Sequence, residues 1–149
     1  MNMKKTGIDY QAYIYALTEQ VEQHIHGLDE LAEQSLQGSL SFNQRSATER
    51  NLQVLTEAVI GVSKHLFKAK GLPVPSEARA AVERIYEHLA LMTPDIKAIR
   101  GAIALRNAIL HDYLNLDWDR ISPVLQERRY LVLHELVTLL CSELGKNKQ

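Results

Sequence analysis

The chain has 149 residues, which is long enough for one domain with a sizeable apolar core. Its 17 basic and 18 acidic side chains give a net charge of −1. This balance excludes the uniform positive field of a bulk nucleic-acid binder, but not a local basic groove. The single cysteine, Cys141, excludes an intrachain disulfide, and the leucines around it predict a buried thiol. We expect a single helical domain over residues 1–149, frayed at 1–7 and 145–149.

The N-terminus has no recognisable targeting signal. Residues 1–6 are polar and basic and are not followed by the apolar core of a signal peptide. No window of the chain approaches the roughly 20 apolar residues that span a bilayer. We therefore expect a soluble, cytoplasmic protein that makes no membrane contact.

Helical periodicity dominates the first half of the chain. Over residues 8–37, mainly apolar residues recur at alternating intervals of three and four, so they line one face of a helix. This spacing predicts one long amphipathic helix. After a break at residues 38–41, we expect Ser46 or Thr48 to cap a second helix over residues 49–70. The positions of the first stripe are Ile14, Leu17, Val21, His24, Leu28 and Leu31.

Prolines and glycines divide the second half of the chain. Residues 71–75 contain two prolines and a glycine, which cannot continue a helix, so they predict a turn. Ser76 is placed to cap a third helix that reaches about residue 91. Thr93-Pro94 has the pattern of an N-cap followed by proline at the first helical position, so a fourth helix should begin there and end near residues 114–115.

Two more cap signals follow. Asp117 is expected to cap a short helical turn, and Ser122-Pro123 is expected to start a last helix that reaches about Leu144. No stretch fits a strand better than a helix. The predicted fold class is therefore all-α, an antiparallel four-helix bundle with one or two short extra helices.

Side chains able to do acid–base and phosphate chemistry crowd into one stretch near the end of the fourth helix. Arg106, Asn107, His111 and Tyr113 follow an apolar helical run. At about 100° per residue, Arg106 and Tyr113 project about 20° apart, and Asn107 and His111 about 40° apart. Arg106 and His111, however, project about 140° apart. They meet at one substrate only if the Arg side chain curls round, if the helix frays near Asp112, or if a second copy of the chain completes the site.

These residue types suit cleavage of an RNA phosphodiester by its own 2′-hydroxyl, a reaction that needs no metal. His111 suits proton transfer because histidine titrates near neutral pH. Arg106 suits charge stabilisation because guanidinium is always charged and grips two phosphate oxygens at once. Asn107 is placed to orient the imidazole or to donate to a phosphate oxygen, and Tyr113 offers a ring for base stacking or a hydroxyl for hydrogen bonding. The alternative is that these side chains only cap carbonyl groups and brace a bundle.

The histidine pairs do not predict a metal site. His24 and His26 diverge by about 200° on a helix. His134-Glu135 begins like the helix of a zinc protease, but Thr138 stands where the second histidine ligand is needed. We expect neither a metal nor a cofactor, and we expect His24, which lies on the apolar stripe, to be a core histidine.

The stretch Arg106-Asn107-x-x-x-His111-x-Tyr113 resembles the Arg-x4-His-x-Tyr signature of HEPN-domain proteins, specifically the HepT-type toxins. The likeness extends to residues 52–58 and to Lys64-His65, so it covers roughly residues 45–140. Gly61 and Ala104-Leu105 depart from the residues that are usual in the family.

The resemblance implies a HEPN bundle that dimerises so that two motifs line one cleft. It implies the toxin of a type VII-like toxin–antitoxin system, a metal-independent endoribonuclease that acts on RNA. Arg106 and His111 would be catalytic, with Asn107 in support. The implied partner is a minimal nucleotidyltransferase antitoxin of the MntA type, which transfers adenylyl groups to Tyr113 and so places negative charge beside Arg106.

Two other hypotheses compete with a toxin ribonuclease. The first is a non-catalytic subunit that presents a nucleotide or other substrate to a nucleotidyltransferase, with Arg106 gripping phosphate. The second is a purely structural dimeric scaffold. The ribonuclease hypothesis predicts that His111→Ala abolishes RNA cleavage while the fold survives, whereas the binding subunit would bind a nucleotide or a partner without loss of RNA.

Overall fold

The computed structural model describes residues 9–146, and every regular element in that range is helical. The prediction of an all-α fold is confirmed, because no strand occurs between residues 9 and 146. In chain order the elements are α1 (Gln11–Gln37), α2 (Phe42–Ala69), α3 (Ala78–His88), α4 (Ile96–His111), the 3₁₀ helix η1 (Tyr113–Asn115), α5 (Trp118–Gln126) and α6 (Leu131–Gly145).

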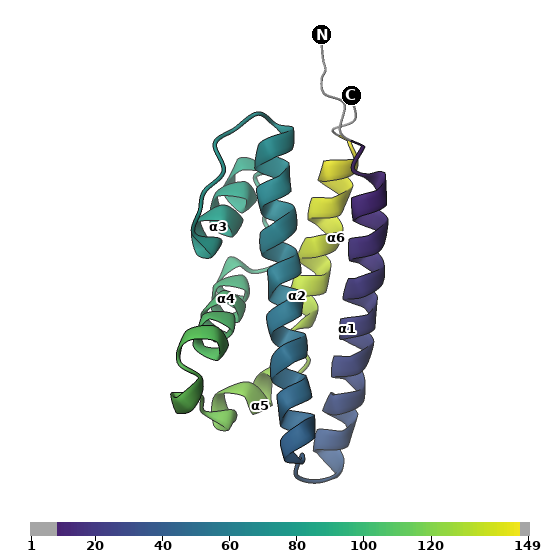
Figure 1. Cartoon of the computed structure of the whole chain (residues 1–149), viewed down its shortest axis with the longest axis vertical. Coiled ribbons are helices and arrows are strands. Elements are labelled where there is room, and N and C mark those ends of the chain that lie inside the picture. Colours follow the sequence, from purple (N-terminus) through teal and green to yellow (C-terminus); the bar gives the residue numbers. More distant parts are fainter. Residues whose placement is uncertain (1–8, 147–149) are drawn as a thin grey trace.

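Helix α2 is the central element of the fold. Figure 1 shows α1, α2 and α6 side by side along the length of the molecule, with α3 and α4 on the side of α2 away from α1. Helix α2 contacts α1, α3, α4 and α6. Because it has neighbours on both sides, α2 buries two faces, and its ten buried residues are far more than a single apolar stripe requires.

The apolar core runs between these helices. Most of its largest fully buried side chains are leucines and isoleucines, whose burial stabilises the fold by about 1.5–3 kcal/mol each. Gly145, the last residue of α6, lies near Gln11 at the start of α1, so the two ends of the described chain meet (Figure 1). The largest fully buried side chains are those of Leu28, Leu55, Leu66, Ile85, Ile99, Ile103, Ile121, Leu125, Tyr130, Leu133, Leu136 and Leu140.

Helix α2 begins earlier than predicted. Ser41 is the N-cap, its hydroxyl accepts from the backbone N–H of Gln44, and the Gln44 side chain accepts from the backbone N–H of Ser41. This capping box corrects the expected caps Ser46 and Thr48. Thr48 is buried within the helix and its hydroxyl donates to the carbonyl of Gln44, as Thr does inside helices.

The predicted caps of the third and fourth helices are also wrong. Glu77, not Ser76, occupies the N-cap of α3, and it makes no side-chain capping bond. Asp95 caps α4, where its side chain accepts from the backbone N–H of Lys97 at 3.0 Å. Thr93-Pro94 lies before this cap and forms a cis peptide bond. Helix α3 therefore starts one residue after its predicted position, because its cap is Glu77 and not Ser76, and α4 starts two residues after its predicted position, because its cap is Asp95 and not Thr93.

The last two helices divide differently from the prediction. Asp117 caps α5 as expected, accepting from the backbone N–H of Asp119 at 2.9 Å. Ser122 and Pro123 lie inside α5, so they do not start the last helix, which begins at Leu131. Pro123 is past the first turn of α5, so it removes the N–H that would otherwise bond the carbonyl of Asp119.

The segment between α5 and α6 is anchored to α1. The buried Tyr130 donates its hydroxyl to a carboxylate oxygen of Asp29, and Arg128 Nη1 lies 3.0 Å from the same carboxylate. A buried hydroxyl without a partner is costly, so this contact fixes the start of α6 against α1. Cys141 is buried on α6, as predicted.

No helix between residues 9 and 146 has the length and apolar character needed to cross a membrane. The expectations for residues 1–7 fall outside the described part of the chain, as do those for residues 147–149.

Candidate functional site

The sequence motif lies where α4 ends. Arg106, Asn107 and His111 belong to α4, whereas Tyr113 begins η1. Asp112 terminates the helix with φ −138° and ψ 40°, which is outside the helical region. The helix therefore stops before the predicted residues 114–115, and the expected 20° angle between Arg106 and Tyr113 does not apply, because the two residues are not on one helix.

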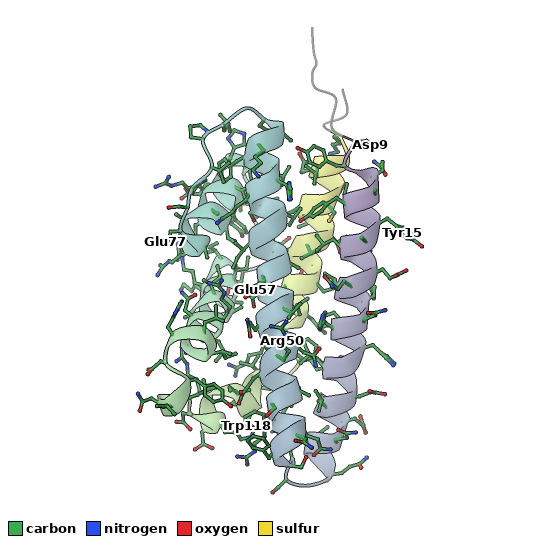
Figure 2. All side chains as sticks on the ribbon, in the orientation of Figure 1. Asp9, Tyr15, Arg50, Glu57, Glu77 and Trp118 are labelled. Carbon is green, nitrogen blue, oxygen red and sulfur yellow. The ribbon has the colours of Figure 1, made fainter. Side chains whose placement is uncertain are left out.

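Arg106 extends toward α2. Its Nε lies 3.7 Å from a carboxylate oxygen of Glu57, and its Nη1 donates to the side-chain oxygen of Asn107 at 2.9 Å. Figure 2 shows Glu57 on α2, facing the side where α4 packs. The Arg106 side chain is only 19% exposed, and its Nε is buried without a hydrogen-bond partner in the described chain. A buried guanidinium N–H that lacks a partner is a group held ready for an acceptor.

His111, unlike Arg106, has its side chain on the surface of the molecule. It is the last residue of α4, it is exposed, and it makes no hydrogen bond or ion pair with any residue in the range 9–146. Asn107 was expected to orient this imidazole, but its side-chain oxygen accepts from Arg106 instead. His111 is therefore free to meet a substrate, a partner or a second copy.

Tyr113 is tied to the start of α2. Burial raises the pKa of the Glu49 carboxyl, and this rise is opposed by the charge of Arg45 and by a hydrogen bond from Tyr113. The Arg45 guanidinium in turn lies 5.1 Å from the centre of the Trp118 ring, a cation–π contact. Figure 2 shows Trp118 beside the first turns of α2. The contact of Arg45 with Trp118 joins α2 to α5, while Tyr113 remains half exposed.

Apolar side chains surround the motif on the outside of the molecule. Leu110, Tyr113 and Leu114 are all exposed, and Leu114 is 97% exposed. We name these three residues the motif surface. Contiguous exposed apolar residues next to a polar site are typical of a surface that a partner covers.

Within one chain, Arg106 and His111 do not converge. The Arg106 side chain is directed to Glu57, so it does not curl toward His111. The helix does end at Asp112, but His111 still belongs to α4, so the angular separation of about 140° persists. Two of the three ways of joining these residues at one substrate are therefore absent from the single chain.

Two carboxylates of the site were missed by the sequence analysis. Glu57 was recognised only as part of a family-like segment, and Glu49 was not singled out. Gln53 donates to Glu57 at 3.1 Å, so the two form a polar pair one turn apart on α2. Such an i, i+4 polar pair on the side of α2 that faces the motif is the signal that could have identified Glu57.

His24 behaves as predicted for a core histidine. It is half-buried on α1, and its Nδ1 is hydrogen-bonded to the side chain of Asn51 on α2. His134 of α6 bonds Glu22 of α1 in a similar bridging contact. These histidines connect helices of the bundle, and neither adjoins the motif.

The model of the ribonuclease HepT-like family matches residues 8–139, which is most of the chain. The protein belongs to the HepT-like family. The resemblance that the Arg-x4-His-x-Tyr motif indicated is thereby confirmed, and the residues matched include all of α1 to α5 and the first half of α6.

Two curated HepT proteins are similar in sequence. The mRNA nuclease HepT of Shewanella oneidensis is 26% identical over 85 residues, which make up 57% of this chain and 64% of that protein. The tRNA nuclease HepT of Aphanizomenon flos-aquae is 31% identical over 83 residues, 54% of this chain and 55% of that protein. The matched region thus spans less than two thirds of each relative.

Two solved structures share the fold. The tri-AMPylated HEPN toxin of Shewanella oneidensis, in complex with an MNT antitoxin, superposes with a TM-score of 0.75 at 19% identity, covering 87% of this chain and 96% of the other. A toxin–antitoxin crystal structure with AMP-PNP gives a TM-score of 0.71 at 19% identity, covering 85% and 96%. At these identities the likeness establishes the helical fold of the HepT-like protein.

Proposed function

We propose that this HepT-like protein is the toxin of a toxin–antitoxin pair, a metal-independent endoribonuclease that acts in the cytoplasm and is silenced by adenylylation of Tyr113. Family membership supports the reaction class. The observation that carries the proposal is the exposed end of α4, where the unpartnered His111 and the half-exposed Tyr113 follow Arg106 in the chain.

The chemistry follows from the residue types. A base removes the proton of the 2′-hydroxyl, O2′ attacks phosphorus, the bond from phosphorus to O5′ breaks, and an acid returns a proton to O5′. The products are a 2′,3′-cyclic phosphate and a 5′-hydroxyl. His111 moves the protons, and Arg106 binds the oxygens on which charge grows. Asn107 supports Arg106, since its side-chain oxygen already accepts from that guanidinium.

Two copies of the chain complete this site. Because Arg106 and His111 point apart in one chain, the Arg106 of one copy and the His111 of the other serve the same phosphodiester. A two-fold dimer brings two such sets into one cleft. The exposed motif surface, above all Leu114, supplies the apolar contact that such a dimer buries.

Adenylylation of Tyr113 fits its surroundings as an off switch. The modification replaces the hydroxyl that bonds Glu49 by a phosphodiester, which brings a negative charge against that carboxylate. The modified side chain must therefore leave Glu49, and it places a phosphate beside the catalytic cations, where RNA would bind. The partner that transfers the adenylyl group is a minimal nucleotidyltransferase, the class to which the MNT antitoxin of the Shewanella complex belongs by name.

One observation favours a second function. Arg106 is already engaged by Glu57 and Asn107 in the single chain, as a phosphate-gripping residue of a non-catalytic binding subunit would be. Such a subunit presents a nucleotide to the nucleotidyltransferase and cleaves nothing.

The experiment that tests the proposal compares wild-type protein with His111→Ala on total RNA in EDTA. We expect cleavage by the wild type with 2′,3′-cyclic phosphate ends and a rate about 10²–10⁴-fold lower for the variant, the range of general acid–base catalysis. Equal melting temperatures show that the fold is intact. Co-expression with the nucleotidyltransferase should add adenylyl-sized mass to wild type but not to Tyr113→Phe. Equal cleavage by wild type and His111→Ala contradicts the mechanism, and no cleavage by either, with nucleotide bound, favours the binding subunit.

A further inference from the structure

A cavity of about 300 Å³ opens between α4, α5 and the start of α6. Four cationic side chains line it, namely Lys97, Arg106, Arg120 and Arg129, and no acidic side chain does. They come from α4, from α5 and from the segment before α6, so the fold, rather than one helix, gathers them. At 300 Å³ the cavity is at the lower end of the size range of ligand pockets.

Two of the four cations are unpaired. Arg129 is paired with Glu127 at 2.8 Å, and Arg106 has Glu57 at 3.7 Å. Lys97 and Arg120 are exposed and have no carboxylate partner among residues 9–146. The cavity thus carries an excess of positive charge on a protein whose net charge is −1, which makes it the kind of local basic groove that a near-neutral chain can offer to a phosphate backbone.

The inner wall of the cavity is apolar. Leu52 of α2, Leu105 of α4, Val124 of α5 and Leu133 of α6 contribute to it. Gly101 lines the same cavity, and a Cβ added there would meet nothing within 4 Å. Cations at the rim, an apolar wall and open space above Gly101 match the parts of one nucleotide, in which charged phosphates flank a flat, weakly polar base.

We infer that this cavity is a nucleotide subsite for the RNA strand, holding one base against the apolar wall and its flanking phosphates on Lys97 and Arg120. Arg106 lines the cavity and also belongs to the motif, so the base held here neighbours the phosphodiester that is cleaved. This inference rests on the proposed function, because it names how the substrate of that same site is held.

The test is binding of a labelled 2′-O-methyl hexaribonucleotide, which cannot be cleaved, measured by fluorescence anisotropy at several salt concentrations. We expect Lys97→Ala and Arg120→Ala each to weaken binding about tenfold. Each should also reduce the steepness of the plot of log binding constant against log salt concentration by about 0.7 per lost phosphate contact. Arg84→Ala is the matched control, because Arg84 is exposed on α3, lies outside the cavity and has no ion-pair partner in the described chain. It should bind as wild type does.

Gly101 gives a second, uncharged test. Gly101→Leu adds a bulky apolar side chain to the cavity lining, whereas Gly101→Ala adds only a Cβ that meets nothing within 4 Å. We expect Gly101→Leu to weaken binding of the hexaribonucleotide about tenfold while leaving an abasic hexamer of the same charge unaffected, because only the base loses its place. Gly101→Ala should bind both probes like wild type.

The outcomes separate this inference from the proposed function. If cavity variants bind as Arg84→Ala does while wild type cleaves RNA, the subsite is wrong and the ribonuclease stands. If they lose binding while no preparation cleaves RNA, the subsite stands and the ribonuclease is wrong. A change of oligomeric mass on Gly101→Leu, with RNA binding intact, means that a second copy fills the cavity and overturns the subsite.

Discussion

Polar side chains in the helical bundle and polar side chains at the end of α4 that carries the motif differ in their hydrogen bonding. In the bundle, the buried hydroxyls of Thr56 and Ser63 donate to backbone carbonyls one turn away, and that of Tyr130 is bonded to Asp29. At the end of α4, the exposed His111 has no partner in the described chain, and Arg106 Nε is buried without a hydrogen bond, although Glu57 lies 3.7 Å away. The polar groups without a hydrogen bond within the protein thus lie at the proposed site, whereas the hydrogen-bonded hydroxyls lie in the bundle.

The two regions also differ in the burial of their leucine side chains. Removing one leucine from each region gives the largest expected difference in stability. Leu136 of α6 is fully buried, so Leu136→Ala should lower the free energy of unfolding by about 2–5 kcal/mol through lost burial and a cavity. Leu114→Ala at the exposed motif surface should change it by no more than about 0.5 kcal/mol. Urea titrations of both variants measure the free energy of unfolding. Similar losses for Leu136→Ala and Leu114→Ala would contradict the difference in burial between the core and the motif surface.

The next largest effect is expected at the anchor of α6. Asp29→Ala leaves the buried Tyr130 hydroxyl without its acceptor and Arg128 without its ion pair, which should cost about 1–3 kcal/mol. The double variant Asp29→Ala, Tyr130→Phe should recover part of that loss, because the orphaned hydroxyl is gone. Thermal unfolding tests this, and a double variant less stable than Asp29→Ala would contradict it.

A smaller effect should separate the observed cap of α2 from the predicted ones. Ser41→Ala removes the hydroxyl that accepts from the backbone N–H of Gln44 and should cost about 0.5–2 kcal/mol. Ser76→Ala serves as the control, since Glu77, not Ser76, is the N-cap of α3 and the contact of Ser76 uses its carbonyl. If the two substitutions destabilise equally in urea, the assignment of the cap is wrong.

The smallest expected effect concerns the pH dependence of the bundle. Burial lowers the pKa of His65 from its ordinary value of 6.5, and the charge of Lys68 lowers it further. The unfolded chain therefore takes up this proton at a higher pH than the folded chain, so the stability contributed by neutral His65 is present above pH 6.5 and is lost as pH falls below it.

Because His65 is partly exposed, the effect on melting temperature between pH 7.5 and 5.5 should be on the order of 1–2 °C. The variant His65→Gln has no titratable group at this position. Its melting temperature should therefore fall by about 1–2 °C less than that of wild type over the same pH range. The groups that pack against the imidazole of His65 are the aromatic rings of Tyr10 and Tyr13. An equal or larger loss in His65→Gln would contradict the assignment.

Much of the fold was accessible from the sequence because it depends on periodicity. The spacing of apolar residues predicted the all-α class, the extent of α1 and the end of α2, but α2 starts at Phe42 and not at the predicted Glu49. Cap residues were harder, since Ser46, Ser76 and Thr93 have the right chemistry at the wrong place. A serine caps a helix only if the backbone turns there, and that depends on which upstream residues the bundle buries.

The site was predicted in residue identity and only in part in geometry. The angles along α4 correctly separated Arg106 from His111, but the helix end at Asp112 removed Tyr113 from the same face. Glu57, Glu49 and the cationic cavity depend on contacts between helices distant in sequence, such as α2 with α4 and α4 with α6. Spacing along one helix carries no information about such contacts.

The measurement that tests the central claim most directly is RNA cleavage by a mixed dimer of Arg106→Gln and His111→Ala chains. The two chains are co-expressed with different tags and purified through both. If Arg106 of one copy serves His111 of the other, each parent dimer is inactive and the mixed dimer, with one complete set of two, recovers about half of the wild-type rate. A mixed dimer as inactive as its parents, beside an active wild type prepared in the same way, would contradict the shared site.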